Sequence, residues 1–309
     1  MAELLGPTEV RELAERLDVT PTKKLGQNFV IDPNTVRKIV RLAGVQPGDR
    51  VIEVGPGLGS LTLGLTEAGA HVTAVEIDHR LAAELPHTVA AMQPQAAARL
   101  RVIRSDALEV TPEQLHGDPV PDASTSSARA SLSERFEGSG LPEVLVANLP
   151  YNVSVPILMH LLEILPSLRS GLVMVQAEVG NRIAAAPGSK EYGSPSAKAA
   201  WYGRWRIAGT VSRRIFWPVP GVDSNLVSFT RAERPIGTEA ERRATFELVN
   251  AAFAGRRKML RQSLQGVLGI PTTAEGAGGA ISAAGVDPTA RAEQLDIGQF
   301  LAIARTVSD

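Results

Sequence analysis

The chain has 309 residues, with 32 Lys and Arg against 33 Asp and Glu, a formal net charge of -1 and no cysteine. The missing cysteines exclude disulfides, thiolate metal sites, cysteine-ligated clusters and cysteine nucleophiles. The N-terminus carries acidic residues where a signal peptide has a basic and then an apolar run, and no stretch approaches 18 uncharged apolar residues. We therefore expect a cytoplasmic protein without a membrane partner or a metal, folded as one large domain or one and a half.

Apolar runs of strand length alternate with helical patterns through the first three quarters of the chain, which predicts an α/β fold with a parallel sheet. The expected strands cover residues 50–54, 72–77, 101–104, 143–147 and 171–176, and the expected helices cover 58–68, 80–92 and 155–165. Two further strand-like runs, 207–216 and 225–230, follow each other closely. So short a link favours an antiparallel pair that closes the sheet.

The remaining segments predict the domain organisation. Residues 117–140 are rich in Ser, Ala, Pro and Gly and lack a periodic apolar face, which indicates a flexible surface insertion. Thr238 and Glu241 have the spacing of a capping box, and helical runs follow near 258–267 and 297–307 with a Gly/Ala-rich connection between them. We predict a catalytic domain over 1–234 and a helical domain over 235–309.

A glycine-rich turn follows the first expected strand of the sheet. Gly55, Gly57 and Gly59 are spaced by two residues, and a helix is expected directly afterwards. Glycines allow a backbone to approach a ligand closely, and a helix N-terminus offers free N–H groups. Ser60 stands where a dinucleotide fingerprint has its third glycine, which disfavours NAD. By itself the turn also fits a tight connection that binds nothing.

Two carboxylates follow the next two expected strands. Glu76 comes twenty-one residues after Gly55, where an acid can accept both hydroxyls of a ribose. Asp106 ends the following strand, where it can accept from an adenine amino group. Each carboxylate alone is more often a solvated loop residue or a helix cap. Together with the glycines they predict a mononucleoside cofactor, and S-adenosylmethionine fits that description.

The fourth strand of the predicted sheet leads into Asn148, Leu149, Pro150 and Tyr151. This motif resembles that of methyltransferases that act on exocyclic amino groups of bases. In that family the Asn side chain and the backbone carbonyl after it accept hydrogen bonds from the target amine, and the aromatic ring stacks on the base. The need is physical, because the lone pair of adenine N6 is delocalised into the ring. Two acceptors favour a more tetrahedral nitrogen and concentrate the lone pair towards the methyl group.

The wider match is to the ribosomal RNA adenine dimethyltransferases of the KsgA type, and it covers nearly the whole chain. It rests on KKLGQNFVID (23–32), VIEVGPGLGSLT (51–62), VEID (75–78), SDAL (105–108), NLPYNVS (148–154), PGSKEYG (187–193), FWPVPGVDS (216–224), GRRKMLRQSL (255–264) and GVDPTARAEQL (285–295). The chain departs from the family pattern at Gly221, where a basic residue is common, and at Ser194 and Pro195.

The resemblance implies roles for individual residues. Asn28 and the backbone at Val30 close over the cofactor, Gly55 abuts its methionine part, Glu76 holds the ribose and Asp106 reads the adenine. Asn148 contacts both cofactor and target amine, and Phe216 opposes Tyr151 across the target base. The cofactor-binding residues expected on this basis also include Gly57, Gly59, Ile77 and Ala107.

The resemblance also implies a fold and a reaction. The fold is the Rossmann-like S-adenosylmethionine-dependent methyltransferase fold, with a seven-stranded, mostly parallel sheet and a small helical C-terminal domain that binds RNA. The reaction is dimethylation of the N6 amino groups of two adjacent adenosines near the 3' end of 16S rRNA in the small (30S) ribosomal subunit. We expect a monomer that acts in ribosome biogenesis.

A basic stretch supports an RNA partner despite the net charge of -1. Residues 201–262 hold twelve Lys and Arg against five Asp and Glu, and eight of the thirteen aromatic residues. Basic residues mixed with aromatics suit phosphate contacts and base stacking, although such a run is often only a solvated face.

Two other functions stay open at this point. One is single-site dimethylation of 23S rRNA, which shares most motifs. The other is a ribosome-assembly factor without catalysis.

Overall fold

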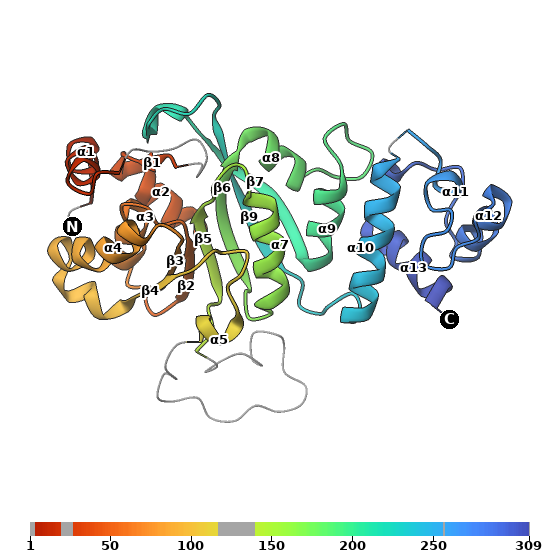
Figure 1. Ribbon diagram of the computed structural model, residues 1–309, viewed down its shortest axis with the longest axis horizontal. Helices are drawn as coiled ribbons and strands as arrows, with labels where there is room; N and C mark the ends of the chain where they lie inside the picture. The colour runs from red at the N-terminus through yellow and green to blue at the C-terminus, as the bar shows by residue number, and fades with distance from the viewer. Residues whose placement is uncertain (1–3, 20–26, 117–139, 256, 309) are drawn as a thin grey trace. The chain divides into compact units, whose positions relative to one another are not determined.

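The computed structural model describes residues 4–19, 27–116, 140–255 and 257–308 (Figure 1). All of the predicted insertion 117–140 except Gly140 lies outside these residues. Contacts divide the chain into two compact units, Met1–Gly180 with Arg206–Arg231, and Asn181–Trp205 with Ala232–Asp309. The domain boundary predicted after residue 234 lies three residues from the break between Arg231 and Ala232, but the grouping of Asn181–Trp205 with the C-terminal unit was not predicted.

The central sheet arranges the site. Within the described residues it has seven strands in the order β4-β3-β2-β5-β6-β9-β7. Neighbouring strands from β4 to β6 are parallel, and β9 runs antiparallel to β6. The strands are β2 (Arg50–Val54), β3 (His71–Glu76), β4 (Leu100–Arg104), β5 (Val144–Asn148), β6 (Ser170–Gln176), β7 (Gly203–Val211) and β9 (Ser224–Arg231). The predicted α/β fold with a mostly parallel sheet is confirmed.

The strands of the first unit alternate with helices (Figure 1). These helices are α1 (Pro7–Arg16), α2 (Pro33–Ala43), α3 (Ser60–Glu67), α4 (His79–Met92), α5 (Pro112–Leu115) and α7 (Ser154–Ile164), and α8 (Ala177–Ile183) follows β6. The sequence explains α2 in local terms. The Asp32 side chain accepts from the N–H groups of Asn34 and Thr35 at its start, and Val36, Ile39 and Val40 are buried at helical spacing. Helices α3 and α4 both pack on β3.

A two-stranded ribbon lies outside the main sheet and corrects one prediction. The run 207–216 is not one strand, because β7 ends at Val211 and a short 3₁₀ helix, Arg213–Ile215, follows it. The next strand, β8 (Phe216–Trp217), pairs antiparallel with β1 (Phe29–Val30). The Ser212 side chain, which caps the 3₁₀ helix, favours this turn over a continued strand. The ribbon thereby joins two of the family motifs.

The second unit is helical, as predicted. It contains α9 (Ser194–Tyr202), α10 (Glu239–Ala254), α11 (Leu260–Ser263), α12 (Ala274–Ala283) and α13 (Ile297–Ser308). Helix α10 packs on both α9 and α13. The capping box is confirmed, since the Thr238 hydroxyl accepts from Glu241 N–H and the Glu241 carboxylate from Thr238 N–H. The Gly/Ala-rich connection, for which no helix was predicted, contains α12, which Thr273 caps.

Candidate active site

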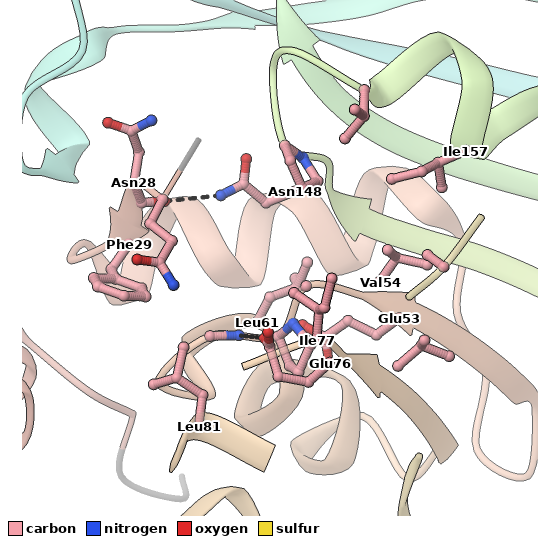
Figure 2. A pocket seen from close by; sticks show the side chains of 18 of the residues that line it. Asn28, Phe29, Glu53, Val54, Leu61, Glu76, Ile77, Leu81, Asn148 and Ile157 are labelled. Atoms are coloured by element: carbon pink, nitrogen blue, oxygen red, sulfur yellow. Dashed lines mark hydrogen bonds between the residues drawn. The ribbon is translucent and has the colours of Figure 1, made fainter. Parts of the chain in front are cut away.

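A cavity of about 250 Å³ lies at the carboxyl ends of β2, β3 and β5, within the first unit (Figure 2). Backbone hydrogen bonds continue beyond the strands, from Gly55 N–H to the Val75 carbonyl over 2.9 Å and from Ser105 N–H to the Glu76 carbonyl over 3.1 Å. The residues that follow successive strands therefore meet at one place.

The structure brings most of the predicted site residues to this cavity. Those that line it are Asn28, Val30, Gly55, Gly57, Glu76, Ile77, Asp106, Ala107, Asn148 and Pro150. Gly59, Leu149, Tyr151 and Phe216 are also among the described residues, but they do not line it.

The glycine-rich loop has a backbone path that other residues rarely adopt. Gly55, Gly57 and Gly59 have φ angles of 66°, 59° and 97°. A Cβ atom on Gly57 would lie 2.8 Å from the Phe29 ring, so a side chain there would displace β1 from the loop. Gly59 is the N-cap of α3, and a Cβ atom there would lie 2.8 Å from Leu85. Gly59 therefore serves the turn rather than the cavity wall.

Glu76 ends β3 with its carboxylate facing the glycine loop. It accepts hydrogen bonds from Gly57 N–H over 3.1 Å and from Asp78 N–H over 3.0 Å. Burial raises the pKa of Glu76, while the two N–H donors lower it. The donors hold the carboxylate in one orientation and leave room for acceptance from a ligand.

Apolar side chains accompany the polar groups at the next strand end. Asp106 follows β4, and its Oδ1 accepts from Leu108 N–H over 2.9 Å. Ala107 is buried, whereas Ile77 and Leu108 line the cavity with exposed fractions of 54% and 37%. Exposed apolar side chains beside a carboxylate suit a planar ring that carries an amino group.

The structure adds a carboxyl group for which the sequence analysis predicted no role. Glu53, in β2, lines the cavity and is only 1% exposed, and Thr62 Oγ1 donates to its Oε2 over 2.6 Å. Burial raises the pKa of Glu53 to about 8, the bond from Thr62 lowers it, and the charge of Glu76 raises it. Glu53 is therefore mainly neutral at pH 7. The sequence signal that could have revealed Glu53 is a carboxylate inside the apolar strand 50–54.

This buried acid predicts a pH-dependent loss of stability. The folded pKa of about 8 exceeds the ordinary value of 4.5, so the folded state binds more protons than the unfolded state between these values. The contribution of Glu53 to the free energy of unfolding must then decrease as pH rises from about 4.5 to about 8. We expect Glu53→Gln, a neutral isostere, to flatten this decrease in urea unfolding measured across that range. Parallel pH profiles for both proteins would contradict the assignment.

Residues 27–30, which include β1, supply one wall of the cavity. Asn148 Nδ2 donates to the Asn28 carbonyl over 3.0 Å, and Ser60 Oγ donates to the Val30 carbonyl over 2.6 Å (Figure 2 shows the first bond). Ser60, noted in the sequence only as a departure from a glycine pattern, thus ties β1 to the start of α3. Residues 23–26 of the same family motif lie outside the described residues.

The Asn-Leu-Pro-Tyr turn places its residues in different surroundings. Asn148 and Pro150 line the cavity, whereas Leu149 is buried and donates its N–H to the Met174 carbonyl over 3.1 Å. Tyr151 is partly buried, and burial raises the pKa of its hydroxyl. Phe216 is 0% exposed, so in this conformation its ring does not reach an open surface.

The aromatic residues of the basic stretch do not offer exposed rings. Trp201, Tyr202, Phe216 and Phe229 are buried, and Trp205, Trp217, Phe246 and Phe253 are partly buried. Packing accounts for them, as in the edge-to-face contacts that Trp201 and Tyr202 make with Phe246. The cations differ, since Arg206, Arg213, Arg214, Arg257 and Lys258 are exposed. RNA contacts from this stretch would therefore be mainly ionic.

The cavity fits S-adenosylmethionine. The glycine loop would take the methionine part, Glu76 the ribose hydroxyls, and Asp106 with the apolar pair Ile77 and Leu108 the adenine. Within the described residues, no helix combines the length and apolar character needed to span a membrane, and no cluster of His, Asp and Glu side chains is arranged to hold a metal ion.

Relatives of high identity cover almost the full chain. A protein named ribosomal RNA small subunit methyltransferase A from Leifsonia xyli is 61% identical over 301 residues, which are 97% of this chain and 98% of the relative. The protein of the same name from Thermobifida fusca is 53% identical over 303 residues, 98% of this chain and 96% of the relative.

Solved structures share the fold at lower identity. A dimethyladenosine transferase from Plasmodium falciparum is 21% identical with a TM-score of 0.69, over 89% of this chain and 95% of that chain. The 23S rRNA methyltransferase ErmE is 23% identical with a TM-score of 0.59, over 91% of this chain and 100% of that chain. At such identities the likeness supports the methyltransferase fold alone.

The family model described as ribosomal RNA adenine dimethylase matches residues 20–309, a span that includes every residue lining the cavity. The reaction of this family is S-adenosylmethionine-dependent dimethylation of adenine in ribosomal RNA, and the cavity holds groups suited to that cofactor. The chain belongs to the ribosomal RNA adenine dimethylase family.

Proposed function

We propose that the protein dimethylates the N6 amino groups of two adjacent adenosines near the 3' end of 16S rRNA, within the 30S subunit. Relatives named small subunit methyltransferase A support the choice of subunit, with more than half of their residues identical to this chain. The observation that carries the proposal is the place of Asn148, which lines the cofactor cavity at the end of β5 and begins the turn that leads to Tyr151.

The mechanism assigns the target amine to this turn. Asn148 Nδ2 is engaged by the Asn28 carbonyl, which directs Oδ1 away from that bond. We assign Oδ1 and the Leu149 carbonyl as acceptors for the two N6 hydrogens. Pro150 fixes the turn, and Tyr151 stacks on the adenine, an interaction worth about 1–3 kcal/mol per base.

The cofactor, when bound, supplies an electrophilic methyl group on a positively charged sulfur. Asn148 remains neutral and needs to abstract no proton before transfer, since the product ammonium is acidic enough to lose its proton afterwards. The same acceptors must then admit an amine that already carries one methyl group.

The assignment of Phe216 requires a change of conformation. Its ring can oppose Tyr151 across a target base only after it leaves its buried position in β8. Base flipping itself costs a few kcal/mol, which stacking on the two rings would partly recover.

We also propose how the parts of the chain divide the work. The catalytic domain is 1–234, although Asn181–Trp205 groups with the helical unit. The helical domain 235–309 binds RNA, a role supported by its exposed Arg257 and Lys258. The chain is expected to act as a monomer, since the first unit by itself supplies every residue that lines the cavity in the described part of the chain. Its substrate places it in the cytoplasm.

Incubation with labelled cofactor and, in parallel reactions, either unmethylated 30S subunits or unmethylated 23S rRNA tests the proposal. We expect label in 16S rRNA and primer-extension stops at two adjacent adenosines near the 3' end, because dimethylation removes both N–H donors of N6. A single modified adenosine in 23S rRNA would overturn the proposal and favour single-site dimethylation of 23S rRNA. Absence of cofactor binding in calorimetry would favour an assembly factor without catalysis.

A further inference from the structure

One hydrogen bond joins the two motifs that are expected to hold the target base. Tyr151 Oη and Ser224 Oγ lie 2.8 Å apart, although the residues are separated by 73 positions in the chain. Tyr151 belongs to the turn after β5, and Ser224 begins β9 and ends the motif 216–224. No role for Ser224 was predicted from the sequence.

The sheet holds Ser224 rigidly. Its side chain is 0% exposed, and it pairs with Gln176 across the β6–β9 ladder. Its neighbours are also fixed, since Ala177 N–H donates to the Asp223 carbonyl over 3.0 Å and Asn225 Nδ2 donates to the Ala177 carbonyl over 3.1 Å. The serine hydroxyl is therefore an anchor with a set position.

The hydrogen bond to Ser224 restrains the orientation of the Tyr151 ring. An aromatic side chain in a turn rotates about two torsions, and a bond at the far end of the ring restrains both. Burial disfavours the unpaired hydroxyl, so the bond to Ser224 also satisfies it. A ring that is fixed before the base arrives loses less entropy when the base stacks on it.

We propose that Ser224 is a positioning residue that holds the Tyr151 ring in the orientation in which it stacks on the target adenine. This inference rests on the proposed function, because it requires Tyr151 to contact the base. Ser224 acts through Tyr151 and does not itself touch the substrate.

Two substitutions remove this bond from opposite sides. Ser224→Ala deletes the anchor, and Tyr151→Phe deletes the hydroxyl while keeping the ring. We expect each to lower kcat on 30S subunits about fivefold to tenfold, the effect of one lost hydrogen bond. The KM for the subunits and the Kd for S-adenosylmethionine stay unchanged within error. The double variant should be no slower than either single variant, because both remove the same interaction.

Ser167→Ala is the matched control. Ser167 is also buried, and its Oγ donates to the Pro142 carbonyl over 2.7 Å, just before β5 begins and at the opposite end from Asn148. Its kcat should equal that of the unmodified protein. If Ser224→Ala does not fold, Tyr151→Phe and its comparison with Ser167→Ala still decide the question.

Tyr151→Ala separates this inference from the proposed function. If Tyr151→Ala keeps normal turnover, the stacking role fails, and the role of Ser224 fails with it. If Tyr151→Ala loses turnover while Ser224→Ala and Tyr151→Phe keep normal kcat, only the positioning role is overturned. Losses that multiply in the double variant also overturn it, because Ser224 would then act independently of Tyr151.

Discussion

Replacing Asn148 by alanine should reduce turnover on 30S subunits about a hundredfold to a thousandfold, the range seen when one group that stabilises a transition state is removed. The variant loses the acceptor at Oδ1 and the bond from Nδ2 to the Asn28 carbonyl. Cofactor affinity should change much less, since one neutral hydrogen bond contributes about 1 kcal/mol, or about fivefold. Single-turnover rates and calorimetric Kd values measure the two effects separately.

Asn34→Ala provides the control for this measurement. Asn34 is exposed on α2 and does not line the cavity in the described part of the chain. Its turnover and cofactor affinity should both match the unmodified protein. Normal turnover of Asn148→Ala would exclude Asn148 as the group that aligns the target amine.

Replacing Glu76 by glutamine should have the opposite signature, with the main loss in cofactor affinity. The carboxylate now accepts from two backbone N–H groups, and a glutamine would turn its own NH₂ group towards one of them or towards the ribose. Hydrogen bonds to a charged group contribute about 1.5–3 kcal/mol, so the Kd for S-adenosylmethionine should rise about tenfold to a hundredfold. Turnover at saturating cofactor should fall less than the affinity does.

Glu12→Gln removes the same charge at an exposed position of α1 and serves as its control. Calorimetry should give it an unchanged Kd. A normal Kd for Glu76→Gln would refute the ribose assignment, whatever its effect on rate.

The meeting of strand-end residues at one cavity could be predicted from the sequence, for a physical reason. In a parallel sheet the residues after successive strands meet at one edge, so the positions of Gly55, Glu76 and Asp106 along the chain already imply their proximity. Gly59 is the exception, because its role in the turn at the start of α3 has the same sequence signature as a role in ligand contact.

The target side was harder to predict because it depends on long-range packing. Phe216 continues an apolar strand-like run, and only the structure shows that the run breaks and that β8 pairs with β1, which begins at Phe29. Helix α12 was missed because three of its ten residues are glycines, which lower helical propensity. The bond between Tyr151 and Ser224 joins positions that no local pattern connects.

The partner of Asn148 is the main-chain carbonyl of Asn28, just before β1, and every residue type at position 28 would provide that atom. The alignment of the amide that faces the target is therefore insulated from point mutations at position 28 and depends on the path of the backbone. Substitutions that displace β1, such as a side chain at position 57, would disturb that alignment without altering any atom of residues 28 or 148. Substitutions at position 28 are thus expected to leave the orientation of the Asn148 amide towards the target amine intact.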